Sequence, residues 1–249
     1  MKIYILLFSL FFTSCSHSSD VLIHIPEASG ICYSKNSDSL FVANDEGKVY
    51  EISREGKLLR KKRLGKYDLE GVTCDDKNNK LIFAVEGKDH LLVVNQKNLT
   101  IQKEVDIKRY YHGINLLKRD KKNHGLEGIT LLNDTLLLSN QSKKKWPKSN
   151  PSVVIKVDYP TTKKKIVIKD IIKHGYKDIS GLCYHNGFLY MVTDTQNLLI
   201  KYDIKNDKTI SSKTVPDGAI EGVAFDNDGY IYFANDEGTI IKTKAKGFL

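Results

Sequence analysis

Carboxylate side chains recur in one short phrase that the chain repeats five times. In the clearest copies a glutamate stands directly before a glycine and an aliphatic residue follows, as in Glu221-Gly222-Val223. Acids appear again where the following apolar run ends, as at Asp236. Because carboxylate and amide oxygens are the ligands that Ca²⁺ and other hard cations prefer, the pattern first suggests cation binding. The glycines that mark the five copies are Gly30, Gly71, Gly128, Gly181 and Gly222.

The spacing of these copies predicts the fold. The glycines are 41, 57, 53 and 41 residues apart, and periods of this size are typical of propellers. Each unit divides into about four short apolar runs separated by turn residues, and no long segment has a helical period. In the second unit the predicted strands are 69–74, 80–85, 91–95 and 100–107. We therefore predict an all-β fold, a β-propeller of five blades with four antiparallel strands each, or of six blades if the 57-residue interval contains a degenerate one.

The last unit lacks one strand. After the predicted strand 239–244 only five residues remain, which are too few for a turn and an outer strand. The apolar segment 21–25, before the first copy, is a suitable donor. A ring closed in this way leaves few unpaired strand edges. We expect residues 21–249 to form a single propeller domain that the N-terminal strand closes.

The N-terminus has the features of an export signal. Lys2 precedes a mostly apolar run at 3–12, which is too short to cross a bilayer as a helix. Thr13-Ser14-Cys15 resembles the lipobox of bacterial lipoproteins. This resemblance implies that residues 1–14 are removed, that Cys15 carries a lipid, and that 15–20 form a short tether to a membrane. We therefore expect a lipid-anchored protein of the cell envelope, with an ordinary signal peptide cut elsewhere as the alternative.

The other three cysteines do not have the spacing of a metal site. Cys32 and Cys183 stand two residues after their repeat glycines, where the other copies have threonine or alanine. This position favours a small side chain, so packed free thiols are expected there rather than a disulfide or a zinc ligand. Cys74 lies one residue further along its own copy.

The net charge of +9 comes from basic runs that lie outside the repeated phrases, at 60–63, 143–145 and 163–165. Aromatic residues do not alternate with these lysines and no helix-turn-helix pattern is present, so nucleic-acid binding is not expected. The runs indicate a solvated rim or, alternatively, an attraction to anionic lipid headgroups. We expect the protein to be a monomer.

Strand direction predicts where the acids lie. Because neighbouring strands alternate in direction, the start of the first strand and the end of the second strand of every unit lie at one mouth of the channel. Acids so close together repel one another, which calls for raised pKa values, nearby lysines or a bound cation. The alternative is that the acids cap strand ends and bind backbone N–H groups, water and neighbouring basic groups. The residues at this mouth are Glu27, Asp68, Glu70, Glu127, Asp178 and Glu221 at strand starts, and Asn44, Asp45, Glu86, Asn140, Gln141, Asp194, Asn235 and Asp236 at strand ends.

Two long connections project from the same mouth. Residues 108–124 include Tyr111, and residues 141–151 include Trp146, the single tryptophan. Long connections on a rigid scaffold commonly carry binding function. We therefore place a candidate ligand pocket between Tyr111, Trp146 and Glu127. Lysine-rich loops without a binding role are the alternative.

Several ordered motifs resemble the SdiA-regulated family of exported bacterial propellers. They include E-A-S-G-I at 27–31, D-L-E-G-V at 68–72, I-E-G-V-A-F at 220–225 and Y-F-A-N-D-E-G at 232–238. More distantly, the Glu-Gly strand starts look like those of calcium-dependent propeller hydrolases of the phytase and gluconolactonase types. That resemblance implies a calcium site with the ligands Glu70, Glu127 and Glu221, followed by Asp45, Asp194 and Asp236. Ser29 and Ser180 stand where that pattern has an acid.

These features lead to three functional hypotheses. The first is an envelope propeller that binds a divalent cation, with calcium expected, and a small ligand at the acidic mouth. The second is a metal-dependent hydrolase of phosphoesters or lactones, in which the metal polarises the substrate and activates water. The third is a platform for an envelope protein partner, without chemistry. The chain has no Ser-His-Asp order, so a metal-free serine hydrolase is not expected.

Overall fold

The fold consists almost entirely of strands and tight turns. The computed structural model describes residues 20–116, 125–161, 164–216 and 218–249. A 3₁₀ helix, η1 (Ala245–Gly247), follows the last strand, and the all-β prediction is confirmed. The strands are β1 (Asp20–His24), β2 (Ala28–Ser34), β3 (Ser39–Asn44), β4 (Lys48–Ser53), β5 (Leu58–Arg63), β6 (Leu69–Asp75), β7 (Lys80–Val85), β8 (His90–Asn95), β9 (Thr100–Lys108), β10 (Tyr110–Tyr111), β11 (Ile114–Asn115), β12 (Leu126–Leu132), β13 (Thr135–Asn140), β14 (Val153–Asp158), β15 (Lys165–Ile172), β16 (Ile179–His185), β17 (Phe188–Thr193), β18 (Leu198–Asp203), β19 (Lys208–Thr214), β20 (Ile220–Phe225), β21 (Tyr230–Asn235) and β22 (Thr239–Lys244).

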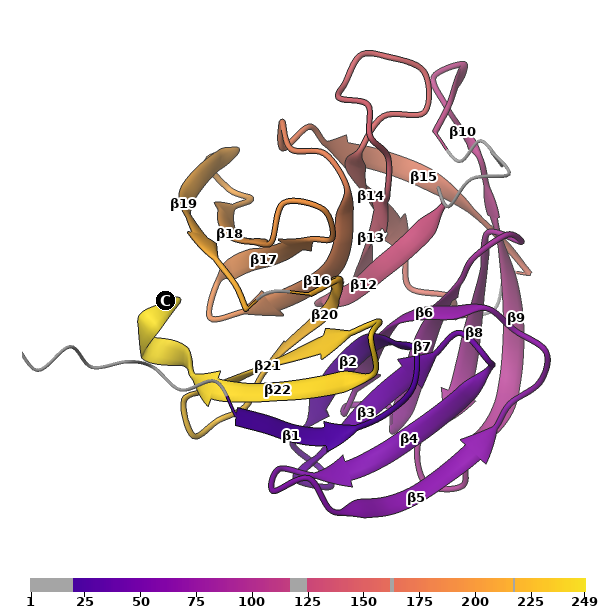
Figure 1. Ribbon diagram of the computed structural model, residues 1–249. Coiled ribbons are helices and arrows are strands. Elements are labelled where there is room, and N and C mark those ends of the chain that lie inside the picture. Colours follow the sequence, from indigo (N-terminus) through magenta and orange to yellow (C-terminus); the bar gives the residue numbers. More distant parts are fainter. Residues whose placement is uncertain (1–19, 117–124, 162–163, 217) are drawn as a thin grey trace, which may run out of the picture.

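Four-stranded antiparallel units repeat along the chain and surround a common centre (Figure 1). From inner to outer strand, the described units are β2-β3-β4-β5, β6-β7-β8-β9, β12-β13-β14-β15, β16-β17-β18-β19 and β20-β21-β22-β1. The outer strands β9 and β15 also pair in parallel, and this pairing joins the second and third units. Between these two units the chain forms the short hairpin β10–β11. This is the architecture of a β-propeller.

The N-terminal strand closes the ring, as predicted. β1 is the outer strand of the last unit and pairs antiparallel with β22, with Val21 opposite Ile241 and His24 opposite Thr239. The other three strands of this unit are β20, β21 and β22. The pairing satisfies backbone groups of β22 that would otherwise form an open edge.

A ring of glycines brings the inner strands into close contact. A Cβ atom on Gly30 would lie 2.4 Å from the carbonyl oxygen of Glu70, and one on Gly71 would lie 2.6 Å from that of Glu127. Such contacts leave no room for a side chain, so each unit requires glycine at this position. A small cavity of about 10 Å³ lies at the level of these glycines. Around the ring the contacts follow the order Gly30, Gly71, Gly128, Gly181, Gly222 and back to Gly30.

Each inner strand also contains a β-bulge at the repeated phrase. The register with the second strand shifts between Leu69 and Val72 in the second unit, and between Ile220 and Gly222 in the last. A bulge adds one residue to the strand and changes the direction of its side chain. This local geometry helps to bring the glutamates of different units together at the mouth of the channel. The bulged segments contain Ser29, Glu70, Glu127, Ser180 and Glu221.

Hydrophobic clusters fill the spaces between neighbouring units. One cluster joins Phe41 of the first unit to Phe83 of the second, and another joins Tyr190 of the fourth unit to Phe233 of the last. All four side chains are almost fully buried. Burying a large apolar side chain contributes roughly 1.5–3 kcal/mol. Since strand pairing lies mostly within the units, this packing holds adjacent units together.

The expectation of a free thiol is wrong for Cys32, which forms a disulfide with Cys74. The bond connects β2 and β6, the inner strands of the first two units. Gly30 lies against the backbone nitrogen of Val72, the residue after the neighbouring repeat glycine. The inner strand β6 is therefore shifted by one residue relative to β2. As a result, Cys32, two residues after Gly30, lies beside Cys74, three residues after Gly71. Cys183 is free, as expected.

Candidate metal site at the acidic mouth

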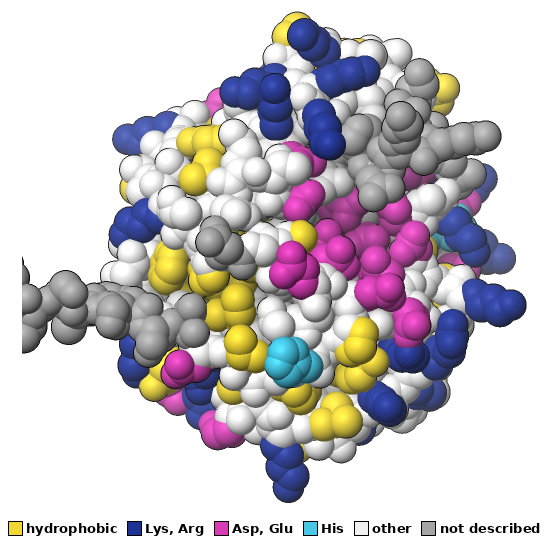
Figure 2. Space-filling model, viewed as in Figure 1, with side chains coloured by type: hydrophobic (Ala, Val, Ile, Leu, Met, Phe, Trp, Pro, Cys, Tyr) yellow, Lys and Arg dark blue, Asp and Glu magenta, His cyan; other side chains and the backbone are white. Residues whose placement is uncertain are grey.

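Carboxylates from different units gather at one mouth of the channel, as the strand directions predict. Figure 2 shows them as an acidic patch near the centre of this face, with lysines and arginines mostly at its periphery. The six predicted ligands comprise Glu70, Glu127 and Glu221 on the inner strands β6, β12 and β20, and Asp45, Asp194 and Asp236 directly after the second strands β3, β17 and β21.

Backbone hydrogen bonds hold the ends of the second strands beside the starts of the first. Glu86 donates its N–H to the carbonyl oxygen of Asp68 over 3.0 Å, and Asp194 donates to Asp178 over 3.2 Å. Each of the five described units has this bond. The other three pairs, donor first, are Asp45 with Glu27, Gln141 with Gly125, and Asp236 with Ala219.

Two groups of three carboxylates have the spacing of a cation site. The first consists of Asp45, Asp68 and Glu70, and the second of Glu70, Glu86 and Glu127. Within each group, one oxygen of each residue lies within 4.8 Å of the others. Ca²⁺ binds oxygen at roughly 2.3–2.6 Å, so two oxygens on opposite sides of the ion are about 5 Å apart. Glu70 belongs to both triads and is therefore the centre of the candidate site.

Burial and mutual repulsion raise the pKa values of the glutamates. Glu70 and Glu127 are each 7% exposed. Loss of hydration, followed by the charges of Glu127, Asp45 and Glu221, raises the pKa of Glu70 well above its usual range. Burial also raises the pKa of Glu127, and a hydrogen bond from Glu70 offsets part of that effect. Burial, followed by the charge of Glu127, raises the pKa of Glu221 to about 10. The mouth therefore favours protons or a bound cation over free carboxylates.

Hydroxyl groups of neighbouring side chains bind some acids of the mouth. Ser29 donates to Asp45, and Thr195 donates to Asp178 over 2.7 Å. Burial nevertheless raises the pKa of Asp45 to about 6, because the bond from Ser29 offsets only part of this effect. Hydrogen bonds from side-chain hydroxyl groups therefore stabilise Asp45 and Asp178. The environment of Glu70 is different, because the charges that act most strongly on it are those of other acids.

The structure divides the predicted ligands into two sets. Asp68 and Glu86 complete the triads; the sequence places both at this mouth but does not identify them as ligands. Their positions in the sequence could have identified them as ligands, because Asp68 precedes β6 and Glu86 follows β7 in the unit that supplies Glu70. The predicted ligands within the triads are Glu70, Glu127 and Asp45, and those at the same mouth outside the triads are Glu221, Asp194 and Asp236.

Tyr111 and Trp146 lie near the third unit. Both side chains are partly buried and pack against one hydrophobic cluster, which includes Leu126. Lys173 lies over the Trp146 ring, 4.7 Å from its centre. The same cluster includes residues of β12, the strand that carries Glu127. A ligand pocket between the three residues stays a prediction, and positions 117–124 of the first loop lie outside the described residues.

A family model described as SdiA-regulated matches residues 21–237. The chain belongs to the SdiA-regulated family. No curated protein matches it. The fold of this family member is similar to that of Myxococcus xanthus glutaminyl cyclase, with a TM-score of 0.66 and 13% identity over 91% of this chain and 95% of that one. It is also similar to Kuenenia stuttgartiensis hydrazine synthase, with a TM-score of 0.51 and 15% identity over 90% of this chain and 58% of that one. At these identities the likeness concerns the fold alone.

The raised pKa values predict how the stability of this SdiA-regulated protein depends on pH. Carboxylates have pKa values near 4 in an unfolded chain, whereas those of Asp45 and Glu221 are about 6 and about 10 in the folded one. At pH values between the unfolded-state pKa and the folded-state pKa of these groups, the folded state binds more protons than the unfolded state. The free energy of unfolding therefore falls as the pH rises. In EDTA, Tm should therefore be several degrees higher at pH 5 than at pH 8.

Thermal melts across this pH range, with EDTA and with Ca²⁺, measure the effect. A bound cation requires deprotonated ligands, so acid should release it and reverse the slope in Ca²⁺. Parallel curves in EDTA and Ca²⁺ would contradict cation binding to these acids, and a Tm in EDTA that does not fall between pH 5 and pH 8 would contradict the assignment of the pH dependence to this mouth.

Proposed function

We propose that this SdiA-regulated protein binds a divalent cation at the acidic mouth and that Ca²⁺ is the preferred ion. The observation that carries the proposal is the position of Glu70, which two carboxylate triads share and which is buried among other acids. A cation between the triads would neutralise charges that burial makes costly. Mg²⁺ requires near-octahedral geometry and usually keeps several waters, whereas Ca²⁺ accepts more oxygen ligands in a variable geometry, which suits a site built from the carboxylates of several units.

A small ligand at the same mouth is part of this proposal. The glycine ring closes the inner side of the site, and the other side opens to the acidic face (Figure 2). Ca²⁺ takes six to eight oxygen ligands, whereas five acids form the two triads. Oxygen atoms of water or of a small anionic ligand would complete the coordination from the open side.

Addition of Ca²⁺ to the metal-free protein is expected to raise Tm. At a free Ca²⁺ concentration one hundred times Kd, binding adds about 2.7 kcal/mol to the free energy of unfolding. For a chain of this length that corresponds to an increase in Tm of roughly 5–10 °C. Thermal melts in EDTA, Ca²⁺ and Mg²⁺ measure the stabilisation, and titration calorimetry gives the stoichiometry. Absence of both a Tm increase and a heat of binding with either ion would refute the cation site.

A metal-dependent hydrolase is the second candidate, and the raised pKa of Glu221 favours it. In the mouth without a cation, burial raises the pKa of the Glu221 carboxyl group to about 10. Glu221 lies outside the two triads, so it is the candidate for donating a proton to a leaving group. A cation beside it would polarise a phosphoester or a lactone. One solved structure of similar fold is a glutaminyl cyclase, so a peptide with N-terminal glutamine belongs in the same assay panel. Turnover that EDTA abolishes favours the enzyme, whereas Ca²⁺ binding without turnover favours the binding protein.

We also propose that Cys15 carries a lipid that anchors the protein to a membrane of the cell envelope. The lipobox-like Thr13-Ser14-Cys15 supports this, as does the Cys32–Cys74 disulfide, because disulfides persist in oxidising compartments outside the cytoplasm. Cys15 itself lies outside the described residues, and within the described ranges no helix is long and apolar enough to span a bilayer. Cys15→Ala should abolish incorporation of labelled palmitate and move the protein to the soluble fraction. Labelling that persists in this variant would contradict the assignment.

A further inference from the structure

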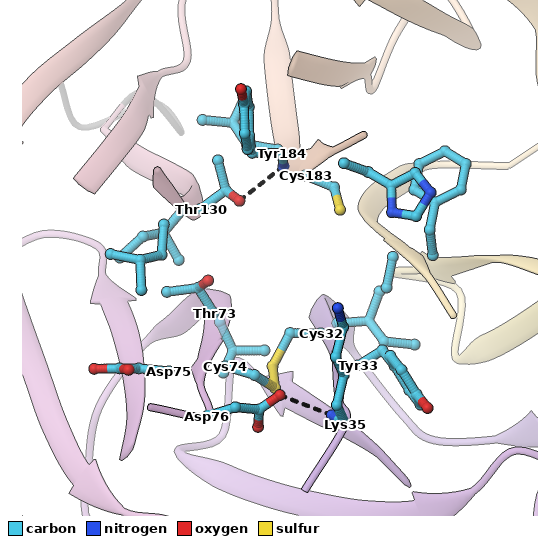
Figure 3. Close-up of a pocket in the computed structure, with 18 of the residues that line it drawn as sticks. Cys32, Tyr33, Lys35, Thr73, Cys74, Asp75, Asp76, Thr130, Cys183 and Tyr184 are labelled. Atoms are coloured by element: carbon cyan, nitrogen blue, oxygen red, sulfur yellow. Dashed lines mark hydrogen bonds between the residues drawn. A yellow bond between two sulfur atoms is a disulfide. The ribbon is translucent and has the colours of Figure 1, made fainter. Parts of the chain in front are cut away.

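A larger cavity opens at the other end of the channel, away from the acidic mouth. Its volume is about 640 Å³, which is within the range of roughly 300–1,000 Å³ found for small-molecule sites. The far ends of all five inner strands line it, together with the turns that follow them (Figure 3). A small cavity of about 10 Å³ lies at the glycine ring. Among the described residues, none of the five acids of the triads lines the larger cavity, so it is distinct from the candidate metal site.

Aliphatic and sulfur-containing side chains line the deep part of this cavity, together with Thr73 and Thr130. Sulfur atoms form part of its wall, from the Cys32–Cys74 disulfide and from the Cys183 side chain, which points toward the centre (Figure 3). Burial raises the pKa of the Cys183 thiol to about 12, so this group is uncharged. The floor favours an apolar body over a polar one. One aliphatic residue from each inner strand lines the floor beside the glycine ring, namely Ile31, Val72, Ile129, Leu182 and Val223.

Internal hydrogen bonds occupy two of the carboxylates that line the cavity. Asp75 accepts a bond from the hydroxyl group of Tyr159. Asp76 accepts one from the backbone N–H of Lys35 over 2.8 Å. A third acid, Asp134, lies on the exposed turn after β12. These bonds, which come from neutral donors, orient Asp75 and Asp76 within the wall of the cavity.

Lys35 brings a positive charge to the opening of the cavity. Its side chain extends from the turn after β2 toward the open centre (Figure 3). Burial, and then the charge of Lys35, lowers the pKa of His185, which also lines the cavity. Lys77 lies on the neighbouring turn after β6. Among the described residues, neither lysine forms an ion pair with a carboxylate.

We propose that this cavity binds a small organic carboxylate with an apolar body. The body would contact the aliphatic floor and the sulfur atoms, and the carboxylate would lie at the opening, where Lys35 and Lys77 supply charged donors. Each methylene group buried on the floor strengthens binding roughly fourfold. A neutral amphiphile lacks the contact with the lysines, and a carboxylate without a body lacks the contact with the floor. Affinity therefore requires both parts in one molecule.

Octanoate, octanamide and acetate are matched probes for the two parts of the proposed ligand, the carboxylate group and the apolar body. In methyl NMR of the purified full chain, octanoate should shift the resonances of Ile31, Ile129 and Val223 on the floor. Octanamide should bind roughly tenfold more weakly, because it lacks the charge-assisted bond, and acetate should not bind in the same concentration range. The core residue Ile240, in the last unit, is the internal control. EDTA should leave octanoate binding unchanged, which keeps this test independent of the cation site.

Substitutions at the opening test the role of the lysines. Lys35→Met and Lys77→Met together should weaken octanoate binding roughly tenfold and leave octanamide binding unchanged. Both lysines are exposed on turns, so Tm should not change. Lys205→Met is the matched control, because Lys205 is also exposed on a turn but does not line the cavity. The proposal is overturned by equal affinity for octanoate and octanamide, by full octanoate affinity in the double variant, or by unshifted floor methyl groups.

Discussion

Replacing Glu70 with glutamine is expected to change cation affinity and metal-free stability in opposite directions. The substitution removes a charged ligand from both triads, so the affinity for Ca²⁺ should fall at least about tenfold. It also removes a buried carboxylate whose pKa is raised by burial and by neighbouring acids. The free energy of unfolding in EDTA should therefore increase, by about 1–3 kcal/mol. Titration calorimetry and denaturant unfolding in EDTA measure the two effects separately.

Glu46→Gln is the matched control for this variant. Glu46 is adjacent to Asp45 in the chain, but it is exposed and pairs with Lys48. It should leave both the Ca²⁺ affinity and the metal-free stability unchanged. Loss of stability of Glu70→Gln in EDTA would show that Glu70 supports the fold, for example through its bond to Glu127, and would contradict the repulsion argument. Unchanged Ca²⁺ affinity would remove Glu70 from the centre of the site.

The strands were predictable because their signals are local in the sequence. In the second unit the predicted strands 69–74 and 80–85 correspond to β6 (Leu69–Asp75) and β7 (Lys80–Val85). The predicted N-terminal strand 21–25 corresponds to β1 (Asp20–His24). Apolar runs and turn residues determine such boundaries within a few positions of the chain. The offset between β2 and β6 has no local signal, because it arises from the packing of two units, and the disulfide was missed for this reason.

The acidic mouth was predictable from strand alternation, but the grouping of its acids depends on their order around the ring. The bulged positions follow the order Ser29, Glu70, Glu127, Ser180, Glu221. Glutamates are therefore neighbours between the second and third units, whereas units with serine flank Glu221 on both sides. Both triads include Glu70 of this pair. The same order explains why Glu221 lies at the mouth but outside the triads, and it was available in the sequence.

Removing the disulfide is expected to have the largest effect on stability. The bond joins Cys32 to Cys74 across a sequence separation of 42 residues, and closing a loop of this length stabilises the folded state by about 4 kcal/mol in the chain-entropy model. Loss of a native disulfide typically costs about 2–5 kcal/mol. Cys32→Ala/Cys74→Ala should therefore lower Tm by roughly 5–15 °C. Thermal and denaturant unfolding of the oxidised protein and of the double variant measure the difference.

Cys183→Ala is the control, because this residue lines the same cavity and leaves the disulfide intact. It should cost about 1 kcal/mol, as most buried substitutions do. A reducing agent should lower the Tm of the unmodified protein to that of the double variant and leave the double variant itself unchanged. Equal Tm values for the oxidised protein and the double variant would contradict the stabilising role of the disulfide.

Because the bond needs an oxidising compartment, protein retained in a reducing cytoplasm should melt like the double variant and gain stability only on oxidation.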